Sequence, residues 1–259
     1  MSSSGSTEYK FWFEGLMPNQ HQAVVDLLGG GADAAHGAEV MFSSWIVCIS
    51  LIALALLGRM ALGAMSSKEG ISKYYADESL SMRNVFELYV GFIKDLSDDL
   101  VGRKNTKIFF WFFGGLFLYI LSCNLLGLLP NATSPSTSIS NNVAMSLTVM
   151  VFFTIVGIRR QGFGGFFGHM MGPLLPLALI IFPIEFMGTF LIRPASLALR
   201  LAGNMNGDHT VLGVTYGLSP YILPIAAYGL GLFVSVVQSF VFTLLTVIYV
   251  VLSLEHDDH

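Results

Sequence analysis

The chain has 259 residues, of which 54% are hydrophobic and only 12% are charged, about half the charged fraction of a typical soluble domain. Its formal net charge of −4 gives no reason to expect nucleic acid as a partner. The two cysteines both lie inside apolar runs, so we expect neither a disulfide nor a metal site, and no pattern calls for a cofactor.

Long uncharged stretches place the chain in a membrane. Residues 108–158 and 210–254 contain no Asp, Glu, Lys or Arg, and about 20 apolar residues are enough to span the hydrocarbon of a bilayer. The alternation of apolar and polar residues that a β-barrel needs is missing, so the spans should be helices. The sequence therefore predicts an all-α membrane protein with about five membrane helices and one amphipathic surface helix.

The first part of the chain combines a polar arm with a membrane helix. Residues 1–39 carry most of the acidic surplus and lack the basic and apolar regions of a secretory signal, so they are predicted to form an N-terminal arm that packs on partner subunits. Residues 40–65 are predicted to form the first membrane helix, because an apolar run starts at Val40 and continues to Leu57.

Residues 66–107 form a polar segment that is rich in basic side chains. Within it, residues 82–101 have apolar side chains at helical spacing on one face and charged side chains on the other. This pattern predicts an amphipathic helix that lies on the membrane surface or against a partner.

The remainder, residues 108–259, should form one helical membrane domain that ends in a hairpin. Its fourth membrane helix would be about 66 Å long if it were straight, twice the thickness of the hydrocarbon, so we expect it to be strongly tilted. The expected segments are spans at 108–129 and 143–158, a glycine-rich turn at 162–172, a long helix at 173–216, a break at 217–220 and a last helix at 221–254.

Basic residues in the loops predict the orientation. The 59–107 segment and the Arg159-Arg160 pair belong on one side, which is the cytoplasm or the matrix. The N-terminal arm and the uncharged 131–142 loop belong on the opposite side, called the lumenal side below. Five spans then place the C-terminus on the basic side.

Arg200 is the most informative residue, because it lies in the middle of a stretch that otherwise reads as membrane helix. A guanidinium stays charged in proteins, and an arginine near the centre of a bilayer costs about 2.5–3.5 kcal/mol even on insertion scales. A chain that accepts this cost usually needs a permanent positive charge at that depth, so we expect an ionic function.

Ionisable residues lie on both sides of Arg200 along the same helix. At 100° per residue, Arg193 and Asn204 point within about 20° and 40° of Arg200, whereas His209 lies on the opposite face and about 13 Å further along. Glu185 lies about 22 Å away in the other direction. This arrangement suits two aqueous half-pathways that a fixed charge divides. The alternative for Arg193 and Glu185 is that they sit near a membrane boundary and extend to its surface.

Gln238 is the notable polar residue of the last helix, which has no ionisable group of the Asp, Glu, Lys, Arg or His type between residues 221 and 254. An amide in lipid needs a partner, and an arginine on the antiparallel neighbour is a candidate. The alternative is that Gln238 joins helices without any further function.

Three motifs resemble one membrane-protein family. Residues 196–205, with the sequence SLALRLAGNM, resemble the signature of subunit a of F-type rotary ATP synthases. Residues 238–245, QSFVFTLL, continuing to Tyr249, resemble that subunit's last helix, and NLLGLLP at 124–130 is a weaker match. The resemblance covers roughly residues 105–255, and the order and spacing of the first two motifs make it specific.

The resemblance implies roles for several residues. Arg200 matches the essential arginine that faces the rotating ring of c subunits, and Asn204 and Gln238 match its polar neighbours. Glu185 resembles the acidic residue of the half-channel on the cytoplasmic or matrix side. His209 stands where mitochondrial members have His and bacterial members have Glu, which implies a mitochondrial inner membrane with the C-terminus in the matrix.

The chain departs from the family pattern at two places. The family pairs the lumenal His with an acid seven residues before the Gln, and this chain has Gly231 there. The lumenal relay would then use Asp208, ordered water or another helix, and we expect a hydrated cavity at His209 and Gly231. Glu185 also precedes Arg200 by fifteen residues, one more than the family pattern, so either a local bulge absorbs the extra residue or Glu185 is not equivalent.

The expected function is that of a stator subunit that forms two offset proton half-channels at the c-ring and couples proton flow to ring rotation. Residues 108–259 would be the proton-channel domain, and the chain itself would not be an enzyme. The expected partners are the c-ring, the peripheral stalk, other Fo membrane subunits, protons and lipid. The alternatives are an ion-coupled secondary transporter, for which internal repeats would be typical, and a structural assembly subunit, which would not need Arg200.

Overall fold

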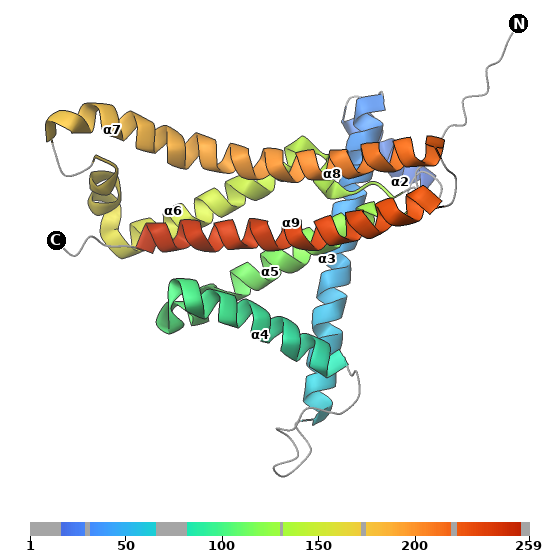
Figure 1. Ribbon diagram of the computed structural model, residues 1–259, viewed down its shortest axis with the longest axis horizontal. Coiled ribbons are helices and arrows are strands. Elements are labelled where there is room, and N and C mark those ends of the chain that lie inside the picture. Colours follow the sequence, from blue (N-terminus) through green and yellow to red (C-terminus); the bar gives the residue numbers. More distant parts are fainter. Residues whose placement is uncertain are drawn as a thin grey trace, which may run out of the picture.

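The computed structural model describes residues 17–28, 32–65, 82–129, 132–171, 175–218 and 222–254. These residues form α-helices with short 3-10 and π segments, and no strand occurs among them (Figure 1). Residues 1–16 and 29–31 of the predicted N-terminal arm, residues 66–81 of the predicted basic segment and the polar C-terminal tail from residue 255 lie outside the described residues. Five helices are long and apolar enough to cross a membrane, which confirms the predicted fold class.

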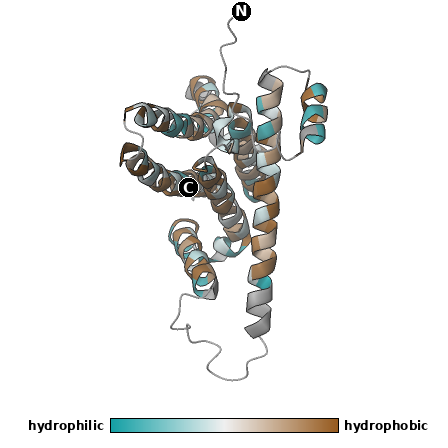
Figure 2. Cartoon of the chain, turned by 90° about the vertical axis from the view of Figure 1, so that its right-hand side faces the viewer, coloured by the Kyte–Doolittle hydropathy of each residue, from teal (hydrophilic) through white to brown (hydrophobic). Residues whose placement is uncertain are grey.

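Two helices pack together at the N-terminal end, α2 (Pro18–Leu27) and α3 (Ala32–Met65). The first membrane helix thus begins at Ala32 rather than at Val40. The reason is packing, because α2 covers the first turns of α3 and buries Ala34 and Ala38. Glu39 is only 1% exposed and lies 3.4 Å from the Nε2 atom of His21 on α2. Figure 2 shows the contrast between the hydrophilic residues of α2 and the apolar length of α3.

The predicted amphipathic helix is present as α4 (Met82–Val101), and it packs against α3, α5 (Arg103–Gly127) and α9 (Ile222–Leu254). Ile93 and Ser97 on its inner face are fully buried. Tyr89 donates a hydrogen bond to the Gly114 carbonyl at 2.6 Å, and burial raises the pKa of this phenol, so it remains a donor at neutral pH. These contacts fix α4 on the membrane domain.

The 3-10 helix η2 (Pro135–Thr137) and α6 (Ile139–Met171) follow α5. The predicted turn at 162–172 is largely helical in its described part. Gly162 interrupts the helix with φ 74° and ψ 165°, a conformation that suits glycine, and the chain bends there. After the bend, Phe166 packs onto Gly157, where an added Cβ would lie 2.7 Å from its ring.

The last part of the chain forms a long hairpin. Its first arm consists of α7 (Leu175–Met187), the π-helix η3 (Gly188–Ile192) and α8 (Arg193–Leu218), which follow one another without a break. The second arm is α9, and Figure 1 shows it running alongside α8 in the opposite direction. In the same view α3 stands across the direction of this hairpin. If α3 crosses the bilayer along its axis, the hairpin is strongly tilted.

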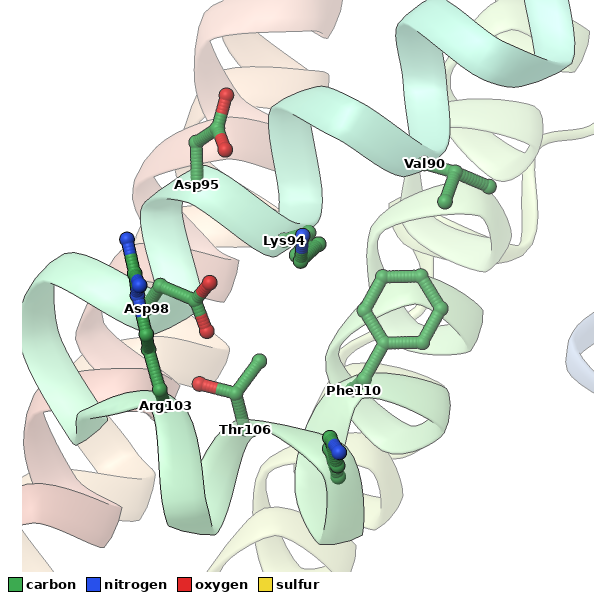
Figure 3. Close-up of a pocket in the computed structure, with 8 residues that line it drawn as sticks. Val90, Lys94, Asp95, Asp98, Arg103, Thr106 and Phe110 are labelled. Carbon is green, nitrogen blue, oxygen red and sulfur yellow. The ribbon is translucent and has the colours of Figure 1, made fainter. Parts of the chain in front are cut away.

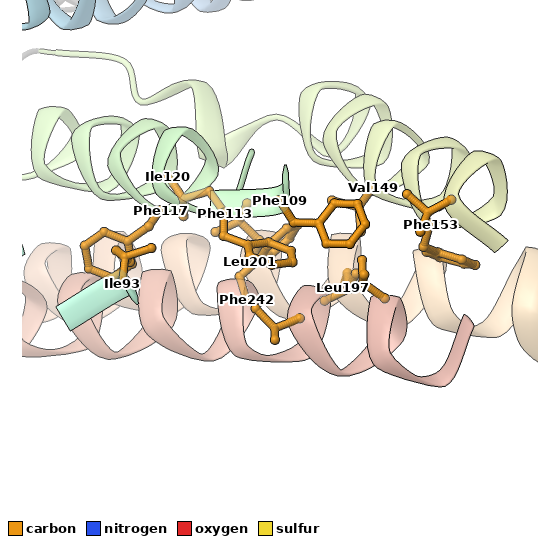
Figure 4. Close-up of a cluster of buried hydrophobic side chains, with 13 residues drawn as sticks. Ile93, Phe109, Phe113, Phe117, Ile120, Val149, Phe153, Leu197, Leu201 and Phe242 are labelled. Carbon is orange, nitrogen blue, oxygen red and sulfur yellow. The ribbon is translucent and has the colours of Figure 1, made fainter. Parts of the chain in front are cut away.

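Aromatic packing joins the helices of the membrane domain. A cluster of buried side chains fills the space between α4, α5, α6, α8 and α9, and Figure 4 shows its centre. Its largest fully buried members are Phe113, Phe153 and Phe242. Because lipid is as apolar as these rings, close packing rather than removal from water is what holds the helices in register.

Candidate functional site

Arg200 lies on the exposed face of α8. Its neighbours Leu197 and Leu201 are buried in the core, whereas Arg200 is exposed and makes no hydrogen bond or ion pair with any residue that the structure describes. Gly203 and Gly207 continue the same exposed face, and an added Cβ at either would meet no atom within 4 Å. The fold therefore presents a guanidinium without a partner among the described residues, on a face where two of the neighbouring positions are glycines.

Asn204 and Gln238 form the polar contact between α8 and α9. The Nδ2 atom of Asn204 donates a hydrogen bond to Oε1 of Gln238 at 2.5 Å. Gln238 is only 4% exposed, and its Nε2 atom has no partner among the described residues. Gln238 thus contacts the residue one turn after Arg200 and not Arg200 itself, because Arg200 points out of the helix pair.

A small polar cavity adjoins this contact, between α5, α8 and α9. Its volume is about 10 Å³, close to the least space that holds one water molecule. Two buried atoms next to it lack partners in the described part of the chain, Oδ1 of Asn124 and Nε2 of Gln238. One accepts and the other donates, so a single water can bridge them. The polar residues that line the cavity are Asn124, Asn204, Asp208, Ser235 and Gln238.

Asp208 and His209 are adjacent in sequence, but only one of them lines the cavity. Asp208 follows Asn204 by one turn and lines the cavity. His209 does not line it, although Met205, one turn before His209, lines the cavity and also packs beside Gly127. Both side chains are half-buried. The acid on the polar interface of α8 and α9 is therefore Asp208.

The prediction of open space beside Gly231 is wrong. Gly231 is buried, and an added Cβ would lie 2.8 Å from Cδ2 of Leu128, so a side chain from α5 occupies the space beside the glycine. The sequence pattern could not show this, because Leu128 comes from another helix. The small polar cavity described above is lined by Gln238 and not by Gly231.

Glu185 and Arg193 pair across the π-helix η3. Nη2 of Arg193 lies 3.5 Å from Oε1 of Glu185, and the guanidinium lies 5.4 Å from the ring centre of Tyr249 on α9. In an uninterrupted α-helix these two residues would point about 80° apart, and a π turn that takes up one residue reduces this to about 20°. The bulge between Glu185 and Arg200 that the sequence spacing suggested is therefore present.

A second polar cluster lies around η2, and the sequence analysis did not single out its residues. Ser134 donates a hydrogen bond to the Cys123 carbonyl at 2.7 Å, and Asn142 donates one to the Ser136 carbonyl at 2.7 Å. Three buried atoms nearby have no partner among the described residues, on Thr137, Asn141 and Asn142. The uncharged polar composition of the 131–142 loop was the available signal. Because η2 packs against α8, this cluster adjoins the first arm of the hairpin.

Comparison with known proteins adds sequence relationships to this geometry. The family model described as ATP synthase A chain matches residues 41–251. ATP synthase subunit a of Bdellovibrio bacteriovorus is 34% identical over 229 residues, which are 88% of this chain and 95% of that protein. The subunit a of Geobacter sulfurreducens is 35% identical, with 85% and 89% covered, and that of Aliarcobacter butzleri is 32% identical, with 88% and 96% covered.

Proposed function

Because the chain belongs to the ATP synthase A chain family, whose members are the proton-translocating stator subunits of Fo, we propose that Arg200 divides two proton half-pathways at the c-ring. The observation that carries this proposal is the unpaired guanidinium on the exposed face of α8. A charge without a partner among the residues that the structure describes is available to a carboxylate on a neighbouring subunit. The subunit is not itself catalytic, since ATP is made in F1.

The chemistry follows from charge and solvation. A carboxylate of the ring must be protonated while it faces lipid, because a bare charge there is costly. Beside Arg200 its ionised form is favoured, so it releases its proton. The same fixed positive charge repels protons and so prevents them from passing directly between the half-pathways. A membrane potential of 100 mV supplies about 2.3 kcal/mol for each charge moved, which drives the ring in one direction.

On the lumenal side, we assign the final proton transfer to the Asp208 cavity. Asp208, Asn204 and Gln238 line one small space with room for one water, and a carboxylate can accept and release a proton. His209 would receive protons from the polar cluster around η2, on the side of α8 that carries Met205. The two ionisable residues would thus act in succession and from different faces of α8.

On the opposite side, we assign proton release to Glu185. It is exposed near the other end of the long arm, and Arg193 holds it through the contact across η3. Arg193 in turn lies beside Tyr249 of α9, so the hairpin fixes the position of this carboxylate. The two groups proposed for proton transfer therefore lie on opposite sides of Arg200 along one helix.

Further proposals concern surroundings and location. The exposed apolar surface of α3 suits lipid or a neighbouring Fo subunit, and the N-terminal arm would pack on partner subunits. The chain is a multi-pass membrane subunit of ATP synthase. The mitochondrial inner membrane, with the C-terminus in the matrix, remains a prediction from His209, whereas the three relatives named above are bacterial. Fractionation of the native cells decides between the two locations.

The experiment for the function is Arg200→Ala in the native membrane. We expect the complex to assemble, as shown by co-purification of the c-ring, and to lose proton-driven ATP synthesis. Arg200→Lys should restore little, because an ammonium can lose its proton in apolar surroundings and a guanidinium does not. Leu199→Ala, which alters an exposed neighbour without changing charge, is the control. Normal synthesis by an assembled Arg200→Ala complex rules the proposal out, loss of assembly favours a structural subunit, and loss of solute uptake favours a transporter.

A further inference from the structure

A second cavity lies far along the chain from the hairpin motifs, between α4 and the first turns of α5. Its volume is about 540 Å³, and Figure 3 shows side chains from both helices around it. One end is lined by charged residues and the other by Val90 and Phe110. Such a division into a polar and an apolar end is typical of sites for amphiphilic molecules.

Three cations line the polar end, Lys94 from α4 and Arg103 and Lys107 from α5. All three are exposed, and none forms an ion pair or side-chain hydrogen bond with the described part of the chain. Asp98 also lines the cavity, and Asp95 lies at its edge with its carboxylate directed away from the other lining side chains in Figure 3. Three cations against two carboxylates leave an excess of one positive charge.

The backbone adds to this excess. The cavity adjoins the N-terminus of α5, where Gly102 precedes the helix with φ 82° and no side chain caps the free N–H groups. A helix N-terminus carries partial positive charge and normally favours acidic residues. The first turn of α5 has no acid and places Arg103 next to the cavity instead. Side chains and helix dipole therefore both favour an anion at this point.

The depth of the cavity selects the kind of anion. By length and composition, the candidate membrane span of α5 begins at Asn105, with Arg103 just before it and Lys107 in its first turn. We therefore infer that these cations lie at the level of the lipid headgroups and that Phe110 lies about one turn deeper. Trp111 is 80% exposed on the same turn, as is common for tryptophan at the boundary of a membrane. On α4, Leu88 and Val90 present exposed apolar surface. The cavity thus passes from headgroup level to the hydrocarbon.

We propose that the cavity between α4 and α5 binds the phosphodiester headgroup of an anionic phospholipid. Arg103, Lys107 and Lys94 contact the phosphate, and Val90 and Phe110 contact the first part of an acyl chain. A phosphodiester carries one negative charge, which matches the excess of one positive charge, whereas free phosphate and nucleotides carry more. The bound lipid then links the amphipathic helix to the membrane domain on the basic side.

The test uses the intact ATP synthase in vesicles of phosphatidylcholine with a minor share of phosphatidylglycerol. Photoactivatable analogues of the two lipids serve as probes, and labelled peptides are identified by mass spectrometry. We expect the phosphatidylglycerol probe to label α4 and α5 and the phosphatidylcholine probe to label them weakly. Each substitution Lys94→Gln, Arg103→Gln or Lys107→Gln should lower the affinity about fivefold, since one cation near the surface is worth that much.

Arg59→Gln and Arg159→Gln are the matched controls, because both residues are exposed cations outside the cavity, and they should leave labelling unchanged. Val90→Trp fills the apolar end without changing charge and should also reduce labelling. Equal labelling of the cavity variants and the controls would overturn the proposal. So would equal labelling by both probes, competition by inorganic phosphate, or absence of label because another subunit covers the cavity in the complex.

Discussion

Asn204 on α8 donates a hydrogen bond to Gln238 on α9, and this pair joins the two arms of the hairpin one turn beyond Arg200. Along α8 the contact lies one turn after the exposed Arg200 and one turn before Asp208, which lines the adjoining cavity. A single amide pair therefore lies between the charge that we propose faces the ring and the proposed proton path.

Gln238→Leu should slow proton conduction, because it removes the acceptor for Asn204 and makes one wall of the cavity apolar. Loss of this hydrogen bond should also destabilise the hairpin by about 0.5–1.5 kcal/mol, since Asn204 is exposed and its amide is not left buried without a partner. Proton uptake by vesicles depleted of F1 measures the first effect. Ser239→Ala is the control, since Ser239 is buried beside Gln238 and bonds only to the Ser235 carbonyl of its own helix. Equal conduction by the two variants would remove Gln238 from the pathway.

Asp208→Asn should lower proton conduction by about 10²-fold, the low end of what a positioned proton-transfer group contributes. Asparagine keeps the shape and the hydrogen bonds of the cavity but does not exchange a proton. The passive proton flux through Fo is the measurement. Thr210→Val, an exposed substitution two residues away, should have no effect. An Asp208→Asn variant with normal flux would return the lumenal relay to His209 and water alone.

His209→Phe should slow conduction as well and remove the dependence on pH near neutrality, because imidazole changes charge in that range. The flux is measured as a function of the lumenal pH. His209 and Asp208 act in succession in our proposal, so the double variant should be little slower than Asp208→Asn alone. Normal conduction by His209→Phe would mean that protons bypass this side of α8.

Insertion of one alanine after Gly188 should abolish ATP synthesis, because the π-helix then has one more residue than it takes up. One added residue turns Glu185 by about 100° relative to Arg200 and separates it from Arg193. Gly188→Ala is the control of equal length, since an added Cβ there meets no atom within 4 Å, and it should retain synthesis. The unfolding temperature should change little in either case, because an exposed ion pair contributes at most about 1 kcal/mol.

Gly127→Ala should destabilise the subunit by about 1–3 kcal/mol through overpacking. An added Cβ would lie 1.8 Å from Cε of Met205 and 2.8 Å from Cβ of Ser134, so α5 would be pushed away from α8 and η2. Gly115→Ala on the same helix meets no atom within 4 Å and should stabilise α5 slightly. Thermal unfolding of the purified complex compares the two, and equal unfolding temperatures would show that this contact adapts.

Local patterns in the sequence predicted most of the helices. The bounds of α4 followed from its apolar spacing, and the hairpin followed from two long apolar runs around a Gly-Pro break. The start of α3 at Ala32 could not be predicted from the sequence. Its first turns are polar, and their helical structure is stabilised by packing against α2. The contact between His21 and Glu39 joins two segments whose pairing no local pattern specifies.

The candidate site was predictable residue by residue but not in its contacts. The positions of Arg200, Asn204 and Gln238 on their helices followed from the motifs. The motifs did not predict that Asp208 lines the cavity, because this depends on which side of α8 faces α9. The side chain of Leu128 fills the space beside Gly231. The periodicity of one helix does not predict a contact of this kind with another part of the chain.

The two exposed glycines beside Arg200 have a mechanical consequence. Neither Gly203 nor Gly207 is required by packing within the chain, since both have open space around them. Side chains that interlock between two helices must be forced past one another when one helix moves, and each such step is an energy barrier. A helix that passes the two glycines meets no side chain from them, so this part of α8 opposes its movement less than an interlocked contact does. Under the proposed function, the ring would rotate past these positions over a lower energy barrier, and Arg200 would be the point at which each carboxylate pauses.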